Sequence, residues 1–327
     1  MGATLARRIA VLRCLCRHIE LRRNQGKMSS QVHTPISGRS IPLMERALCG
    51  YARSLPLTWG KYRIINALWR GVAGDNHQRE ARLIYSDFRV PCDIGEMIQR
   101  QLYFFGTYQL ERTMLEVWQN LARRSTTIFD VGANAGVYSL AALSANPGAS
   151  VHAFEPTPEI AERLRQTKAL NGLANLVIAE TAVCHHSGQT RLVKCDGGGD
   201  NGGMNYIGDQ TGAQDSVLVD ATSLDEYCYR NGIDQIDLMK IDVQGLEADV
   251  MRGASELLSR RKIGQVLVEL NWGELGEGSP ADDVIMLLES YGFQFSDICA
   301  TPQWRRSGPW LRKHADIMAS QIEDAAA

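Results

Sequence analysis

Residues 128–136 read IFDVGANAG, in which a short run of β-forming residues leads through Asp130 into a loop bounded by Gly132 and Gly136. Glycine gives the backbone the freedom that a tight turn between a strand and a helix requires. A loop of this kind commonly holds a phosphate or a ribose beside a helix N-terminus. Three ligand classes are therefore open: a dinucleotide, a nucleoside triphosphate, or a sulfonium nucleoside such as S-adenosylmethionine (SAM).

The spacing of the loop argues against both phosphate ligands. The middle glycine of GxGxxG is missing, and no lysine follows as GxxxxGK[ST] requires. Asp130 would also repel a phosphate, whereas it suits the ammonium and sulfonium groups of SAM. The structural alternative for Asp130 is a cap on the N-terminus of the following helix.

Glu155 ends the next predicted strand, residues 150–155. A carboxylate at this point can accept hydrogen bonds from two ribose hydroxyls, each worth about 1.5–3 kcal/mol. Folds that bind NAD place an acid at the same point, so Glu155 alone does not separate SAM from a nicotinamide cofactor. Its structural alternative is an acid that favours the helix begun by Pro158.

Strands and helices alternate from residue 127 onward, which predicts a mainly parallel sheet with helices on both faces. The predicted strands are residues 127–130, 150–155, 176–179, 237–242, 265–269 and 293–298, and the predicted helices are 136–145, 158–171, 247–259 and 280–291. Asp130, Glu155, Asp242 and Glu269 each end one of these strands. Ligands on such sheets bind at the carboxyl ends of the strands, so the four acids are expected to face one crevice.

Composition excludes several classes of protein. With 327 residues, 22% of them charged, and a net charge of -2, the chain lacks the basic excess of a nucleic-acid binder. The eight cysteines form no CxxC pair, which favours free thiols in a reducing, cytoplasmic compartment. No apolar run is long enough to cross a bilayer.

The N-terminal residues 1–41 form a basic leader followed by a linker rich in Ser, Gly, Pro and Thr. Residues 1–27 carry seven Lys and Arg against the single acid Glu20, and their apolar residues recur at helical spacing. Two interpretations stay open: a disordered leader, with translation starting instead at Met28 or Met44, or a helix lying peripherally on an anionic membrane surface.

Four stretches of the chain resemble the FkbM-type methyltransferases, and the resemblance runs from about residue 94 to residue 272. They read DVGANAGVYSL from residue 130, VHAFEPTPEIAERLRQTKALNGLANL from 151, ATSLDEY from 221 and LMKIDVQGLEADVMRGA from 238. The last block is the most specific, although many family members have Glu where this chain has Gln244. The resemblance implies a class I, Rossmann-like α/β fold and SAM-dependent methylation, mostly of oxygen.

The resemblance also implies which residues hold SAM. Those that would cradle its methionine end and sugar are Asp130, Gly132, Asn134 and Gly136. Glu155 would hold the ribose, and Ala182 would lie near the adenine through its backbone. With this fold, the chain is expected to divide into the leader (1–41), an N-terminal mixed α/β cap (42–124), the SAM-binding domain (125–300) and a C-terminal tail (301–327).

Methyl transfer to a hydroxyl requires positioning of two partners and removal of a proton. Strand alternation puts Lys240 and Asp242 on one side, with Asp242 at the edge of the crevice, and Glu247 opens the next helix. Asp242 is therefore expected to be the base or to orient it, with Lys240 and Glu247 in support. The alternative is a buried Lys240–Asp242 ion pair that serves the sheet alone. No tight ligand cluster indicates a metal.

The sequence thus predicts a SAM-dependent O-methyltransferase whose acceptor is a small molecule, a glycan or a lipid-linked sugar. The rivals are a nicotinamide-dependent oxidoreductase and a non-catalytic SAM-fold binding protein. Two further features stay open at this point. The glycine-dense residues 196–208 suit either a lid or an insertion. The aromatic side chains that suit either the helix core or an acceptor pocket are Tyr103, Phe104, Phe105 and Tyr108.

Overall fold

The computed structural model describes residues 43–54, 59–73, 76–193, 206–207, 216–271, 280–297 and 314–321. All of them belong to one compact unit, Thr34–Ala327. The basic leader and nearly all of the glycine-dense segment lie outside the described residues, so the expectations for them stay predictions. Among the described helices, none is long and apolar enough to cross a membrane.

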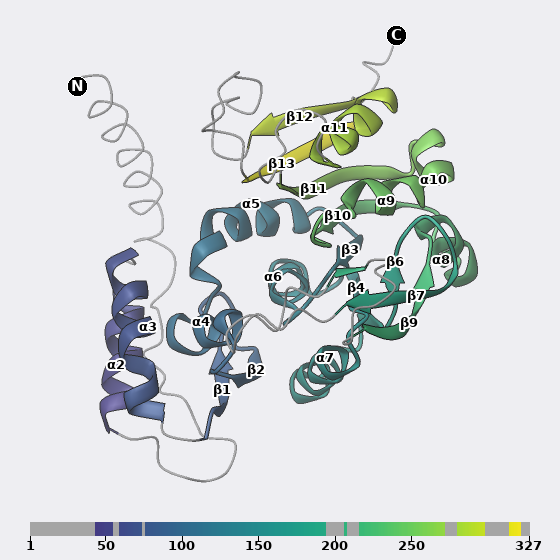
Figure 1. The fold of residues 1–327 in the computed structure, drawn as a ribbon. Coiled ribbons are helices and arrows are strands. Elements are labelled where there is room, and N and C mark those ends of the chain that lie inside the picture. The colour runs from purple at the N-terminus through teal and green to yellow at the C-terminus, as the bar shows by residue number, and fades with distance from the viewer. Residues whose placement is uncertain are drawn as a thin grey trace, which may run out of the picture. The chain divides into compact units, whose positions relative to one another are not determined.

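A seven-stranded sheet forms the centre of the unit, in the order β12-β13-β11-β10-β3-β4-β5 (Figure 1). Its strands are β3 (Thr127–Val131), β4 (Ser150–Phe154), β5 (Leu176–Ala179), β10 (Ile236–Ile241), β11 (Ile263–Asn271), β12 (Phe293–Asp297) and β13 (His314–Gln321). The strands from β11 to β5 pair in parallel, whereas β13 is antiparallel to both of its neighbours. The predicted mainly parallel sheet is confirmed.

Each face of this sheet is covered by a separate apolar cluster, because consecutive side chains of a strand point to opposite faces. On one face Ile128, Leu238 and Leu267 pack with α5 (Arg112–Ala122) and α6 (Val137–Ala145). On the other, Phe129, Met239 and Val268 pack with helices of the second half of the chain. Those helices are α8 (Leu224–Asn231), α9 (Glu247–Arg252), α10 (Ser255–Ser259) and α11 (Pro280–Ser290). Helices therefore cover both faces, as expected.

The N-terminal cap shares its core with the first of these faces. It consists of α2 (Leu43–Arg53), α3 (Trp59–Ala73), the antiparallel hairpin β1 (Gln78–Arg82) and β2 (Arg89–Asp93), α4 (Met97–Phe105) and η1 (Gln109–Glu111), followed by α5. The Arg53 guanidinium donates hydrogen bonds to the carbonyls of Phe104, Tyr103 and Arg82, which ties α2 to α4 and the hairpin. Tyr103, Phe104 and Phe105 are at most 1% exposed, so these three aromatics form core.

Three parts of the fold differ from the sequence expectations. The C-terminal strand β13 lies inside the sheet, so the sheet continues past residue 300, where the sequence suggests a tail. A second, four-stranded sheet joins β6 (Ala182–Val183), β9 (Ser216–Thr222), β7 (Gly188–Val193) and β8 (Tyr206–Ile207). The predicted helix 247–259 is interrupted at Gly253, where an added Cβ would lie 2.2 Å from the backbone oxygen of Cys184.

Candidate active site

The loop after β3 is held in one conformation by its backbone. Gly132, Asn134 and Gly136 all have positive φ, at 79°, 47° and 74°. The amides of Gly132 and Ala133 donate to the carbonyl of Phe154, at 3.0 and 2.9 Å, and so fasten the loop to the end of β4. An added Cβ on Gly132 would lie 1.9 Å from the backbone oxygen of Asp242. The glycine therefore permits direct contact between this loop and the one after β10.

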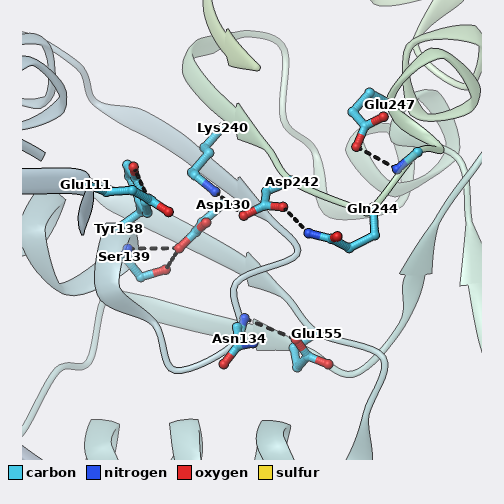
Figure 2. A network of polar contacts seen from close by, with 11 residues as sticks. Glu111, Asp130, Asn134, Tyr138, Ser139, Glu155, Lys240, Asp242, Gln244 and Glu247 are labelled. Atoms are coloured by element: carbon cyan, nitrogen blue, oxygen red, sulfur yellow. Dashed lines mark hydrogen bonds and ion pairs between the residues drawn. The ribbon is translucent and has the colours of Figure 1, made fainter. Parts of the chain in front are cut away.

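Asp130 lies beneath that loop and is 1% exposed. Its Oδ2 accepts hydrogen bonds from the amide of Ser139 at 2.8 Å and from the Ser139 hydroxyl at 2.6 Å, within the first turn of α6 (Figure 2). Burial raises the pKa of Asp130, against the opposing effects of Lys240 and Ser139. Asp130 thus binds the first turn of α6, which is close to the helix-capping role considered as its structural alternative. Its direct contact with SAM stays a prediction.

Glu155 faces the same loop from the end of β4. Its Oε2 accepts a hydrogen bond from the amide of Asn134 at 3.0 Å (Figure 2). Its Oε1 accepts one from the amide of Thr157 at 2.9 Å. Burial raises its pKa, while these donors lower it. A carboxylate oxygen can accept more than one hydrogen bond, so both oxygens remain available to vicinal hydroxyls. This geometry suits a ribose.

Lys240 and Asp242 lie on the same side of the chain, as strand alternation predicts. The Lys240 ammonium lies 2.8 Å from Oδ2 of Asp242 and 4.4 Å from the ring centroid of Tyr138. In the sheet, Lys240 is the register partner of Asp130 on β3. Burial lowers the pKa of Lys240, but the surrounding carboxylates outweigh it and the net pKa is raised. Lys240 is thus the buried cation of an acidic cluster.

Asp242 stays ionised because several donors stabilise its negative charge. Burial raises its pKa, yet the Lys240 ammonium and the hydrogen bond from Gln244 hold it below its usual range. The Gln244 side-chain amide donates to Oδ1 at 3.1 Å. Glu247, 5% exposed, accepts a hydrogen bond from the amide of Gly245 at 2.9 Å and closes the turn on itself. Asp242 and Glu247 thus lie at the two ends of one turn, and each accepts a hydrogen bond from within it.

Glu111, in η1 of the cap, belongs to this cluster and was not anticipated from the sequence. The Tyr138 hydroxyl donates to its Oε2 at 2.6 Å (Figure 2). Burial raises the pKa of Glu111 to about 7, and the charges of Asp242 and Glu269 add to that rise. Tyr108 lies near the same charges, so this aromatic side chain borders the site, unlike the three core aromatics at positions 103–105. No local pattern marks Glu111, because only tertiary packing brings it to the strand ends.

Ala182 lies in the second sheet, where it pairs with Ala221 of β9 and is 1% exposed. Its side chain belongs to the small apolar cluster of that sheet. A backbone contact with adenine stays a prediction. Across the described part of the chain, no group of His, Cys, Asp and Glu side chains is arranged to hold a metal ion.

A cavity of about 510 Å³ lies at the opposite edge of the sheet, and its lining includes Thr126, Ser150, His152 and Asp237. Asp237 already accepts hydrogen bonds from the Thr126 amide and hydroxyl, both at 2.6 Å. His152 Nδ1 lies 2.9 Å from the Tyr227 hydroxyl. The cavity adjoins the amino ends of β3 and β4, so it is separate from the acidic cluster.

The strand order, the antiparallel insertion of β13 and the glycine loop at the carboxyl edge together define the class I methyltransferase fold. The family model described as the methyltransferase FkbM domain matches residues 130–295. Since that match spans more than half of the sequence, the chain belongs to the FkbM methyltransferase family and is a SAM-dependent methyltransferase. The resemblance noted from the sequence is confirmed.

Several known proteins are similar to this chain. The 2-O-methyltransferase NoeI of Sinorhizobium fredii is 28% identical over 184 residues, covering 52% of this chain and 74% of that protein. The 31-O-demethyl-FK506 methyltransferase FkbM of Streptomyces tacrolimicus is 28% identical over 199 residues, with the same 52% and 74%. A solved SAM-dependent methyltransferase from Agrobacterium tumefaciens aligns at 10% identity and a TM-score of 0.40, covering 75% of this chain and 70% of its own.

The donor set at the carboxyl edge fits SAM. The Glu155 carboxylate suits the ribose hydroxyls, and its hydrogen bond from the Asn134 amide holds it beside the loop from Gly132 to Gly136. The acidic side chains beyond that loop suit the two positive groups of SAM, whereas they would repel the phosphates of a nucleotide.

The Glu155→Gln variant is expected to bind SAM about 10- to 100-fold more weakly, because charge-assisted hydrogen bonds to the ribose become neutral ones. Isothermal titration calorimetry of both proteins with SAM measures this. The matched control is Glu162→Gln on α7 (Pro158–Asn171), an exposed carboxylate 3.4 Å from Arg165. Equal affinities of the wild type and Glu155→Gln would show that Glu155 does not hold the ribose.

Proposed function

We propose that this methyltransferase transfers the methyl group of SAM to a hydroxyl oxygen of a small molecule, a glycan or a lipid-linked sugar. The observation that carries the proposal is the contact between Gly132 and Asp242, which brings the Lys240–Asp242 pair directly beside the cofactor loop. The names of the relatives NoeI and FkbM describe methylation at oxygen, which supports the same reaction here.

The proposed roles follow from the charges in the site. When bound, SAM supplies an electrophilic methyl group on a positively charged sulfur. Asp242 accepts a hydrogen bond from the acceptor hydroxyl and orients it, since a carboxylate whose pKa is lowered stays ionised and binds a proton weakly. Lys240 keeps Asp242 charged, and Glu247 fixes the turn that carries it.

The test combines cofactor binding with identification of the product. Titration with SAM and with NADH is expected to show binding of SAM alone, which separates this function from a nicotinamide-dependent oxidoreductase. Incubation of the protein with cell extracts and SAM carrying a deuterated methyl group, followed by mass spectrometry, is expected to reveal one labelled class of acceptor. Release of that label as methyl iodide on cleavage of the methyl ether with hydriodic acid would assign the oxygen.

A non-catalytic SAM-binding protein, the other possibility that the sequence left open, is disfavoured by the relatives NoeI and FkbM, whose names describe methyl transfer. Tight SAM binding with no labelled product in any extract would favour it.

The surroundings in which the reaction takes place are also proposals. We infer an acceptor other than nucleic acid from the net charge of -2, and a cytoplasmic location from the free cysteines that the sequence indicates. Peripheral membrane contact through residues 1–41 is tested by flotation with anionic vesicles, comparing the full chain with one that begins at Met44.

A further inference from the structure

We propose that Glu111, which the N-terminal cap contributes to the site, is the general base that takes the proton from the acceptor hydroxyl. The proposal rests on the hydroxyl-methylating function proposed above. Glu111 lies outside the region matched by the family model, which begins at residue 130. The cap would then supply chemistry to the site.

The geometry places Glu111 across the buried lysine from Asp242. Figure 2 shows Glu111 and Tyr138 on one side of Lys240 and Asp242 on the other. The Tyr138 hydroxyl holds Oε2 of Glu111 at 2.6 Å, while the Tyr138 ring lies against the Lys240 ammonium at 4.4 Å from its centroid. Within the described residues, Oε1 of Glu111 has no hydrogen-bond partner and is the oxygen left for the acceptor.

Tyr138 is itself fixed by its neighbours, so Glu111 is held by a rigid support. The Trp118 indole N–H donates to the backbone oxygen of Tyr138 at 2.9 Å, and the two rings meet edge to face at 5.5 Å. Trp118 lies on α5, directly after η1, and is fully buried. A base held in this way meets the geometric requirement for proton transfer, provided that the acceptor oxygen lies within hydrogen-bond reach.

The two carboxylates of the site differ in how readily they bind a proton. Asp242 is stabilised as an anion by Lys240 and by its hydrogen-bonding neighbours, which makes it a weak base. Glu111 lies farther from the same lysine. Burial, together with the like charges of Asp242 and Glu269, raises its pKa to about 7. A base works best when its pKa lies near the working pH, and that condition selects Glu111.

The proposed step balances in atoms and charge. The O–H bond of the acceptor breaks, its proton passes to Oε1 of Glu111, and the electron pair of the oxygen forms the bond to the methyl carbon. The electrons of the former carbon–sulfur bond stay on sulfur as a neutral thioether. Lys240 remains paired with Asp242 throughout, and the proton on Glu111 passes to water when the products leave.

The first test uses the full chain and the extract fraction that the wild type labels from SAM. Glu111→Gln, which retains an acceptor for the Tyr138 hydroxyl, is expected to bind SAM with unchanged affinity and to transfer methyl groups about 10²- to 10⁴-fold more slowly. The matched control is Glu116→Gln on α5, the helix that follows η1. Glu116 is a carboxylate paired with Arg112 at 3.4 Å, and its variant is expected to keep the wild-type rate.

The pH dependence gives a readout that a purely structural role would not move. The groups facing Glu111 are Lys240, Tyr138, Asp242, Glu269 and Tyr108. Because the base must be deprotonated, the wild-type rate is expected to rise with pH through about 7. Tyr138→Phe removes a hydrogen bond that lowers this pKa, so its profile is expected to shift to higher pH. In Glu111→Gln the rise is expected to disappear.

A third readout needs no turnover. In protein labelled with carbon-13 at the glutamate carboxyls, one resonance is expected to titrate near pH 7 and to be missing from Glu111→Gln. If Glu111 titrates with the ordinary pKa of a glutamate, or if Glu111→Gln is as fast as the wild type, Glu111 is not the base. Either result leaves the proposed function untouched. A wild type that labels no fraction overturns the proposed function as well.

Discussion

The Lys240→Met variant is expected to lose about 3–5 kcal/mol of unfolding free energy near neutral pH, the usual cost of leaving a buried charge without its partner. Lys240 is 5% exposed and is the cation around which Asp242, Glu111 and Asp130 gather. Methionine fills a similar volume but carries no charge, so these carboxylates would face one another unscreened. Urea denaturation followed by circular dichroism measures the loss.

The pH dependence of that loss identifies its cause. Lys240 depresses the folded-state pKa of Asp242, so the stability it contributes is present above the unfolded value of about 3.9 and vanishes as pH falls through the lower folded value. The gap between wild type and Lys240→Met should therefore close on acidification. Lys168→Met, at the end of α7, is the matched control and is expected to change stability by less than about 0.5 kcal/mol. A loss below about 1 kcal/mol for Lys240→Met would contradict a desolvated charge cluster.

The Gly132→Ala variant is expected to lose SAM binding and about 2–6 kcal/mol of stability, the sum of backbone strain and overpacking. Its φ of 79° is unfavourable for a side chain, and the new Cβ would lie 1.9 Å from the backbone oxygen of Asp242. Backbone cannot rotate away as a flexible side chain can, so the loops after β3 and β10 must separate. Calorimetry with SAM and thermal denaturation measure the two effects.

Gly172→Ala separates the two causes, since Gly172 has a φ of 63° and nothing within 4 Å of the added Cβ. Only the backbone strain of about 1–2 kcal/mol should remain there, and SAM affinity should not change. If Gly132→Ala resembled Gly172→Ala in both measurements, the close approach of the two loops would not matter for the site.

Much of the central domain could be predicted from the sequence because its signals are local. The strands β3, β4, β5 and β10 are short apolar runs, and the helices between them have the expected periodicity. The small sheet and β13 could not be predicted in this way. The strand residues 188–193, GQTRLV, have no clear alternation, and the pairing of β13 with β11 is a contact between segments far apart in the sequence.

The residues of the candidate site also differ in how far the sequence could predict their positions. Glu155, Lys240 and Asp242 could be placed because the end of a parallel strand is a defined position in space. The environment of Asp130 was harder to predict, since a strand-end carboxylate can face either a ligand or the next helix, and here Ser139 engages it. The place of Glu111 in the site depends on how η1 and α5 pack against α6, which no local sequence pattern indicates.

The position of β13 has a consequence for synthesis of the protein. β12 hydrogen-bonds to β13 alone among the strands of the sheet, and β13 includes residues 314–321. While the ribosome is still making those residues, β12 has no neighbour and the edge of β11 is unpaired. The sheet can therefore close only when residues 314–321 have emerged, and a nascent chain stalled before that point presents an open β edge to chaperones and to other copies of itself.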